Sequence, residues 1–137
     1  MEKEFEILNH TADVGIIAYG ANMKEAFANA AKALFSLITD LDNVEEVTQR
    51  DIELTAPDQE SLLVGWLNEL IYLFDAENLL FKRFDIVQLS QTHLKARSYG
   101  EKVTSKHKLK IGVKAATYHM LKINQNNGVS LQVLFDI

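Results

Sequence analysis

Carboxylates are the side chains of this chain with the best potential for chemistry. Asp13 lies in the otherwise small and apolar stretch HTADVGI, and Asp136 is followed by the α-carboxylate of Ile137. Hard cations such as Ca²⁺ and Mg²⁺ prefer oxygen ligands of this kind. Each group also has an ordinary interpretation, because Thr-Ala-Asp is good turn chemistry and an exposed terminus tolerates two charges at little cost.

Other reactive chemistries find little support in the sequence. Cysteine is absent, which excludes disulfides, thiolate zinc sites and thiol catalysis. The four histidines, at positions 10, 93, 107 and 119, have none of the spacings HxxxH, HxH or HExxH. Neither a glycine-rich phosphate loop nor a nucleophile elbow is present. The acidic stretch TDLDNVEE (39–46) lacks the pattern of a calcium loop, so we interpret it as a solvated exit from a helix.

The charge balance argues against a dedicated nucleic-acid-binding protein. The net charge is −5, whereas such proteins usually carry a positive domain or a basic stripe. The one basic concentration, with His107 among its members, consists of Lys102, Lys106, Lys108, Lys110 and Lys114. We interpret it as a solvated edge hairpin protected by lysines. Contact with an acidic partner or with RNA is the alternative.

Two amphipathic helices must position these residues. In ANMKEAFANAAKALFSLITD (21–40) the apolar residues recur at helical spacing, and Asn22 with Glu25 suggests a capping box. A second helix is expected from about Asp58, after Pro57, through SLLVGWLNELIYLFDAE (61–77). Its wide apolar stripe is typical of a helix that packs on a sheet.

The remaining segments alternate in the manner of strands. They are EFEILNH, VGIIAYG, RDIELTA, LFKRFDIVQLS, HLKARSYGE, KLKIGVKAATYHMLKIN and VSLQVLFDI, with NQNNG (124–128) as the clearest hairpin turn. This order predicts an α+β fold: a single two-layer domain spanning residues 1–137, in which two main helices pack on one face of a largely antiparallel sheet. The length of 137 residues suits one domain.

Neither a membrane span nor a secretion signal is expected. No apolar run reaches the roughly 18 residues of a transmembrane helix. The first residues, MEKEFEIL, are charged and lack the apolar core of a signal peptide. We therefore expect a cytoplasmic protein without a membrane partner.

Four motifs together resemble the archease family. NHTADVGIIAYG with EAFANAAKALFSLITD is similar to its amino-terminal signature, and ESLLVGWLNELIYLFDAENLLF is similar to its central helix. VKAATYH resembles the late motif of the family, and VLFDI its terminus. The similarity runs from about Phe5 to Ile137, and the order and spacing of the four motifs make it specific.

The resemblance implies an activator. Archeases assist the RtcB-type tRNA-splicing ligase, which uses GTP and a divalent metal and passes through a guanylylated histidine. They promote guanylylation and multiple turnover of the ligase without joining RNA themselves, so RNA is expected to be contacted only through the ligase. The family metal site, described with calcium, maps onto Asp13, Asp136 and Ile137. Calcium is therefore the expected ion, with Mg²⁺ or Mn²⁺ as alternatives.

Other residues of these motifs are expected to support the metal site or to contact the partner. His10 and Thr11 could orient Asp13 by hydrogen bonds to it. Lys114 could pair with the carboxylates or with a phosphate, or be an ordinary lysine of an edge strand. His119 is expected to be a buried structural hydrogen-bonding residue, or else a contact to the partner.

Two functions of other classes remain open. A stand-alone metal-dependent phosphoesterase could use the carboxylates and Lys114, although no general base of clear spacing is visible. An RNA-binding or chaperone-like adaptor is the second alternative. RNA binding by such an adaptor would weaken with salt, and a chain of net charge −5 should bind RNA weakly at physiological salt.

Overall fold

The computed structural model describes residues 3–9 and 13–137. In chain order its elements are β1 (Phe5–Asn9), β2 (Asp13–Gly20), α1 (Met23–Ile38), the short 3-10 helix η1 (Leu41–Asn43), β3 (Thr48–Thr55), α2 (Gln59–Glu77), β4 (Leu79–Leu89), β5 (His93–Lys102), β6 (Ala115–Asn124) and β7 (Val129–Asp136). The described strands form two antiparallel sheets, one of four strands in the order β1-β2-β7-β6 and one of three in the order β3-β5-β4.

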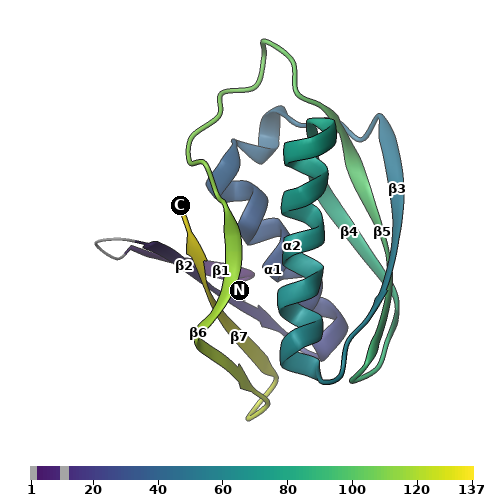
Figure 1. Ribbon diagram of the computed structural model, residues 1–137, viewed down its shortest axis with the longest axis vertical. Helices are drawn as coiled ribbons and strands as arrows, with labels where there is room; N and C mark the ends of the chain where they lie inside the picture. Colours follow the sequence, from purple (N-terminus) through teal and green to yellow (C-terminus); the bar gives the residue numbers. More distant parts are fainter. Residues whose placement is uncertain (1–2, 10–12) are drawn as a thin grey trace.

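Both helices lie between the two sheets (Figure 1). Helix α1 packs against β2 of the four-stranded sheet and against β4 of the three-stranded sheet, while α2 contacts β6 and the three-stranded sheet. The α+β class, the two helices and the antiparallel pairing agree with the sequence prediction. The single sheet covered on one face does not, because the strands divide between two sheets.

The sequence of α1 explains its central place. Ten of its residues are buried, and they are distributed around the helix rather than along one stripe: Ala26, Phe27, Asn29, Ala30, Ala31, Ala33, Leu34, Phe35, Leu37 and Ile38. A helix that is apolar on most sides must be covered on most sides. Trp66 of α2 is fully buried beside it and donates from Nε1 to the carbonyl of Phe27, over 3.0 Å, which joins the two helices.

The helix ends follow the expected capping chemistry. Asn22 caps α1 by accepting from the amide of Glu25 at 2.9 Å, and Asp58 caps α2 by accepting from Ser61 at 2.7 Å. The Glu25 carboxylate accepts from the amide of Ala21, one position before the partner that a capping box requires. Helix α2 ends at Asn78, which has the left-handed conformation common at helix ends.

The basic segment differs from its prediction. Residues 103–114 form an irregular loop, and the strand begins only at Ala115. The amide of Lys110 donates to the carbonyl of Ile38 at the end of α1, so the loop backbone has hydrogen-bond partners outside a strand ladder. The turn at 124–128 is present as predicted, with positive φ at Asn127 and Gly128. No helix in the described ranges is long and apolar enough to cross a membrane.

Candidate functional site

Two aspartates meet where β2 begins and β7 ends. Asp13 is the first residue of β2, Asp136 is the last of β7, and the antiparallel ladder pairs them directly. Their neighbours Val14 and Phe135 belong to the core. Because side chains alternate along a strand, Asp13 and Asp136 point to the opposite, helix-free face of the four-stranded sheet.

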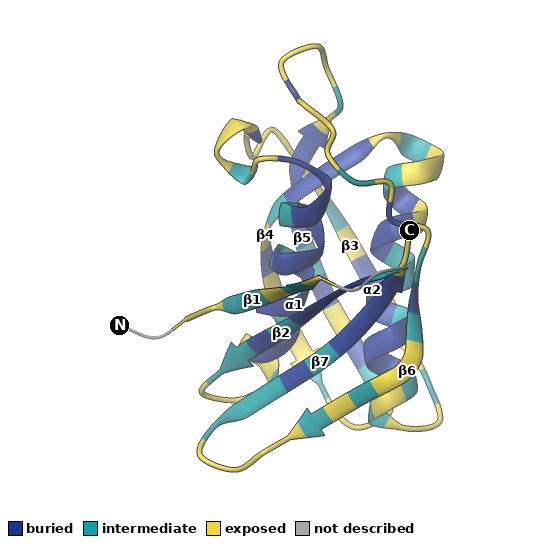
Figure 2. Ribbon diagram, turned by 90° about the vertical axis from the view of Figure 1, so that its left-hand side faces the viewer, coloured by how far each residue is buried: buried dark blue, intermediate teal, exposed yellow. Residues whose placement is uncertain are grey.

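A third strand completes this corner of the sheet. Ala115, the first residue of β6, pairs with Asp136 on the side away from Asp13. The amide of Lys114 donates to the carbonyl of Asp136 at 2.8 Å. The backbone around Asp136 is therefore fixed on both sides. Figure 2 faces this sheet and shows β7 between β2 and β6.

The electrostatics of the pair are unfavourable. Like charges directly opposite each other in a ladder destabilise a sheet. Within the described ranges, neither Asp13 nor Asp136 forms an ion pair, and the Oδ1 atom of Asp13 is buried without a hydrogen-bond partner. A buried carboxylate oxygen left unpaired is costly. Among the described residues, therefore, no ion pair neutralises either carboxylate.

A divalent cation of the hard type fits this donor set. Two carboxylates converge from adjacent strands, one of them with an unsatisfied buried oxygen. Ile137, the third residue of the expected ligand set, follows β7 directly and is 46% exposed. Side chains alone do not complete a ligand cluster, since no three His, Cys, Asp or Glu side chains of the described residues gather around one point. The set therefore suits an ion that keeps open positions.

The residues that were expected to support the site differ in how they agree with the structure. Lys114 is exposed beside Asp136 and free of ion pairs within the described ranges. His119 is exposed, so the expectation of a buried hydrogen-bonding residue was wrong. The cause is an irregularity of β6 between Thr117 and Lys122, which takes this segment out of the ladder. His10 and Thr11 lie outside the described residues.

Asn68 is a residue of this region that the sequence did not reveal. From α2 its side chain reaches Ala116 of β6, accepting from the amide at 2.7 Å and donating to the carbonyl at 3.3 Å. It thereby acts as a strand partner for the edge of the sheet, close to Lys114. An asparagine inside the apolar run WLNEL was the available signal.

A second network fixes the loop before β6. Glu101 accepts from the amide of Glu45 at 2.8 Å and is paired with Lys106 at 2.9 Å and His107 at 3.0 Å. The pKa of Glu101 is lowered to about 2. The hydrogen bond from the Glu45 amide contributes most to this shift, and Lys106 and His107 contribute less. Nδ1 of His107 accepts from the amide of Thr104 at 2.9 Å. These groups satisfy one another and anchor the loop.

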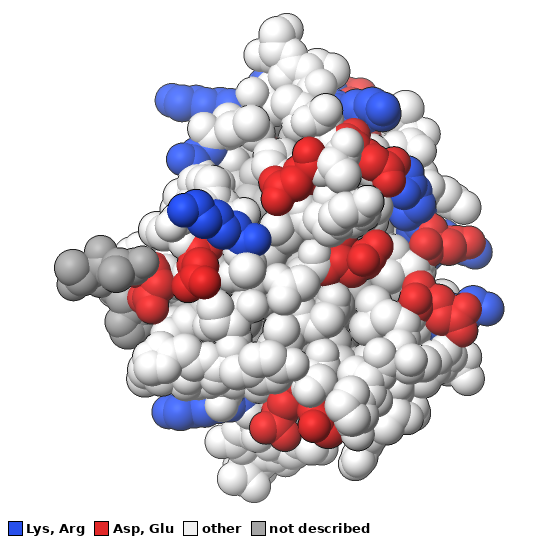
Figure 3. Space-filling view, in the orientation of Figure 1, with Lys and Arg blue, Asp and Glu red and all other residues white. Residues whose placement is uncertain are grey.

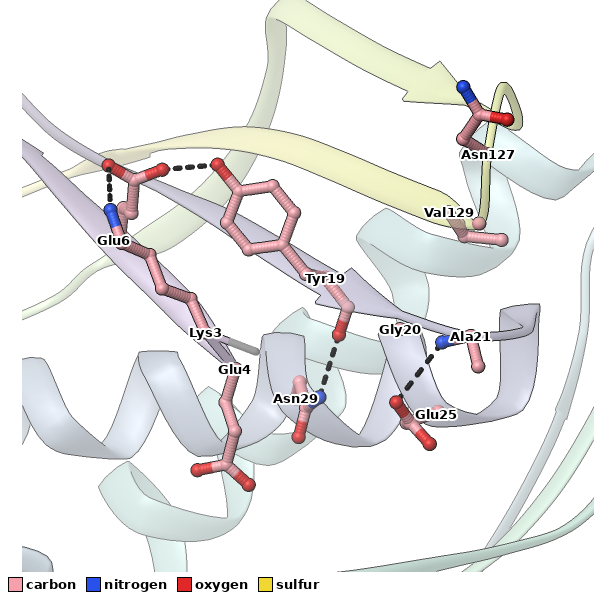
Figure 4. Close-up of a pocket in the computed structure, with 11 residues that line it drawn as sticks. Lys3, Glu4, Glu6, Tyr19, Gly20, Ala21, Glu25, Asn29, Asn127 and Val129 are labelled. Atoms are coloured by element: carbon pink, nitrogen blue, oxygen red, sulfur yellow. Dashed lines mark hydrogen bonds and ion pairs between the residues drawn. The ribbon is translucent and has the colours of Figure 1, made fainter. Parts of the chain in front are cut away.

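A pocket of about 700 Å³ opens at the other end of β2 (Figure 4). Its polar groups already have partners: Asn29 donates to the carbonyl of Tyr19 at 2.7 Å, and the hydroxyl of Tyr19 donates to Glu6. This hydrogen bond raises the pKa of Tyr19 and lowers that of Glu6. The pocket does not include Asp13 or Asp136, and among the described residues no buried side-chain atom without a hydrogen-bond partner lies in its lining.

Comparison with known proteins gives one consistent result. The model of the Archease protein family matches residues 5–137. The protein archease of Methanosarcina mazei is 40% identical over 141 residues, covering 98% of this chain and 97% of that protein. The protein archease of Sulfolobus acidocaldarius is 43% identical over 126 residues, covering 90% and 91%.

Solved structures have the same fold. The solution structure of Methanobacterium thermoautotrophicum protein 1598 superposes with a TM-score of 0.85 at 36% identity, covering 98% of this chain and 99% of that one. A crystal structure from Thermotoga maritima, described as an archease and possible chaperone, has a TM-score of 0.66 at 21% identity. It covers 100% of this chain and 98% of its own, and at this identity it supports the fold alone.

Proposed function

The chain belongs to the Archease protein family, and from this premise we propose that it activates an RtcB-type tRNA-splicing ligase and joins no RNA itself. The observation that carries the proposal is the ladder pairing of Asp13 with Asp136, with one buried oxygen of Asp13 unpaired. Proteins violate local rules of stability mainly where function requires it. The role implies the cytoplasm as the compartment of action.

In this proposal Asp13, Asp136 and the Ile137 carboxylate hold a divalent metal, Ca²⁺ first, with Mg²⁺ or Mn²⁺ as alternatives. Such an ion supplies positive charge that accepts oxygens of a phosphate or of a partner protein. The two aspartates fix its position from adjacent strands, and the backbone hydrogen bond from Lys114 keeps Asp136 in place. The Lys114 ammonium, exposed beside them, is available to a phosphate of the ligase-bound nucleotide.

The overall charge supports a protein partner that handles RNA. A chain of net charge −5 is attracted to a basic surface, and this attraction increases the rate of encounter. Activation of a ligase is also a specific form of assistance to another protein. It is therefore compatible with the possible chaperone role given for the Thermotoga maritima relative.

A guanylylation assay of the ligase tests the proposal. The ligase is incubated with labelled GTP and divalent metal, with and without this protein, and the guanylylated fraction is followed over time. Wild-type protein should accelerate the reaction, whereas Asp13→Asn, Asp136→Asn and a chain extended by one residue after Ile137 should reduce the stimulation at least tenfold. Asp75→Asn is the matched control, because Asp75 is an exposed carboxylate on α2.

Two results would contradict the proposal. Full stimulation by both aspartate variants would remove the carboxylate pair from the mechanism. Hydrolysis of a phosphoester panel by the isolated protein, lost in the Asp13 variant, would favour the phosphoesterase instead. Thermal unfolding of each variant separates these results from loss of the fold.

A further inference from the structure

One stretch of this acidic chain is basic. Residues 102–135 contain six of the fourteen Lys and Arg residues and none of the nineteen Asp and Glu residues. This stretch includes the loop 103–114 and strand β6, which is an edge of the four-stranded sheet. We call this loop and strand together the basic edge. Figure 3 shows basic side chains over the loop that leads into β6, along the upper left of the molecule.

The lysines of the basic edge are presented by a fixed backbone. The carbonyl of Lys108 accepts from the hydroxyl of Thr39 at 2.9 Å, and the amide of Lys110 donates to Ile38 at 2.8 Å. Lys108, Lys110 and Lys122 are exposed, and none forms an ion pair within the described ranges. A long loop without secondary structure in a small domain is usually functional.

Strand β6 adds an exposed aromatic side chain to these charges. Between Thr117 and Lys122 the strand leaves its ladder with β7, and Met120 has a positive φ of 55°. Non-glycine residues rarely adopt this conformation, and such outliers concentrate at functional sites. As a result Tyr118 is 59% exposed and Met120 is 49% exposed. No aromatic residue lies among the lysines of residues 102–114 in the sequence, whereas the structure presents Tyr118 on the same edge.

We propose that the basic edge binds single-stranded RNA, with Lys108, Lys110 and Lys122 on phosphates and Tyr118 stacked on a base. Positive charges that follow a backbone, combined with an aromatic platform, form the usual means of binding single strands without sequence preference. Single-stranded RNA uses both features at once, because its phosphates pair with lysines and its bases stack on an aromatic ring. The inference goes beyond ligase activation and does not depend on it.

The geometry also places the path of the bound strand close to the carboxylate corner. Lys114 lies between Lys110 and Asp136, and four residues of extended chain span at most about 14 Å. An RNA held along the basic edge therefore passes within one or two nucleotides of the carboxylate corner. The net charge of −5 keeps this binding weak, so it is measurable at low salt and helps a partner-bound RNA rather than capturing free RNA.

Fluorescence anisotropy with a labelled, unstructured 12-nucleotide RNA tests the inference in the absence of any ligase. Wild-type protein should bind in 25 mM salt, and its affinity should fall steeply by 200 mM. Replacing Lys108 and Lys110 together by alanine should reduce the slope of log affinity against log salt by about 1.4, since each phosphate contact on a single strand contributes about 0.7. The control double variant is Lys82→Ala with Lys95→Ala on the three-stranded sheet, which should leave the slope unchanged.

The aromatic contact has a closely matched control. Tyr118→Ala should weaken RNA binding about tenfold, as expected for a lost stacking contact. Tyr72→Ala should not, although Tyr72 on α2 is equally exposed at 59%. No RNA binding at 25 mM salt, or equal losses in the control variants, would overturn the inference. Equal binding of a poly-glutamate peptide, insensitive to Tyr118→Ala, would overturn it in favour of an acidic protein. None of these three outcomes bears on ligase activation.

Discussion

The two sheets treat charge on their outer faces in opposite ways. On the three-stranded sheet Asp51 and Arg97 are ladder partners and their side chains form an ion pair at 2.8 Å. His93 and Glu53 are linked at 2.6 Å, and Arg83 pairs with Asp85. On the four-stranded sheet the ladder places Asp13 against Asp136, with no compensating ion pair within the described ranges.

This difference separates an outer face whose charges are paired within the sheet from one whose carboxylates oppose each other. Cross-strand opposite charges contribute modestly to a sheet, and directly opposed like charges oppose its folding. On the three-stranded sheet the charged side chains named above pair with one another. The four-stranded sheet has its carboxylates and its exposed lysines on adjacent strands, and neither set is neutralised by the other.

The largest expected effect concerns the central strand of the three-stranded sheet. A Cβ atom at Gly100 would lie 1.8 Å from the carbonyl oxygen of Leu80, so Gly100→Ala should lower the free energy of unfolding by at least about 3 kcal/mol. Gly15→Ala, in the four-stranded sheet, should cost only about 1 to 2 kcal/mol, because its nearest contact is the end of the Leu134 side chain and the backbone oxygen of Val133 lies farther away, at 3.2 Å. Urea unfolding measures both.

Gly65 provides the control for these glycine variants. It lies inside α2, and its added Cβ would meet only Leu54, at an ordinary 3.5 Å. Gly65→Ala should therefore raise stability by about 0.5 to 1 kcal/mol. Equal losses at Gly100 and Gly15 would show that the two sheets are packed with the same tolerance.

A divalent cation should stabilise the four-stranded sheet through its aspartates. At a calcium concentration of one hundred times Kd the free energy of unfolding should rise by about 2.7 kcal/mol, and excess chelator should reverse the gain. Asp13→Asn should abolish this response. Asp51→Asn on the other sheet should keep it, so a calcium response that survives Asp13→Asn would locate the ion elsewhere. Unfolding curves with and without Ca²⁺ provide the measurement.

Glu101, at the end of the three-stranded sheet, should make the free energy of unfolding depend on pH in the acidic range. Its pKa in the folded protein is about 2, below the ordinary 4.5. Its stabilising contribution is therefore fully present above about pH 4.5 and is lost as the pH falls toward 2. Glu101→Gln should lower the free energy of unfolding by about 2 kcal/mol at pH 7, the scale of a lost hydrogen bond to a charged group.

The pH profile of Glu101→Gln shows whether its loss of stability arises from charge or from packing. The difference between wild type and Glu101→Gln should narrow between pH 4.5 and pH 2, since the wild-type carboxylate is neutralised there. Lys106, His107 and Glu45 all contact Glu101. Parallel stability curves over that window would show that packing, not charge, causes the loss.

The smallest effects on the free energy of unfolding are expected for one aspartate variant from each sheet, compared in metal-free buffer. Asp51→Asn breaks an exposed ion pair and should cost up to about 1 kcal/mol. Asp13→Asn relieves a like-charge contact and should leave stability unchanged or raise it by less than about 1 kcal/mol. Both changes should shrink in 1 M salt. A loss of stability in Asp13→Asn would mean that the charge of Asp13 already has a favourable partner.

The sequence predicted the elements better than their assembly. Hydrophobic periodicity and capping residues located both helices, since these signals are local. The division of strands into two sheets depends on which distant segments pair, and no local signal carries that information. The start of β6 was placed too early for a similar reason, because the backbone of Lys110 is satisfied by the end of α1 and not by a neighbouring strand.

The candidate site shows the same limit. The neighbourhood of Asp13 and Asp136 was expected from family resemblance, and the ladder register that opposes them became visible only in the structure. The exposure of His119 and Tyr118 follows from the irregularity of β6, which a regular alternation of residue types does not announce. Asn68 reaches β6 through a tertiary contact that spacing along its own helix cannot predict.

The pairing of β2 with β7 also determines when the site can exist. Residues 13–20 are among the first of the chain to be synthesised, yet their partner strand comprises residues 129–136. Contacts between segments so distant in sequence form late in folding, because the loop that separates them must first be closed. During synthesis the central helices and the three-stranded sheet can assemble before β7 has left the ribosome. The carboxylate corner is therefore assembled last, and an unfinished chain cannot present it to a partner.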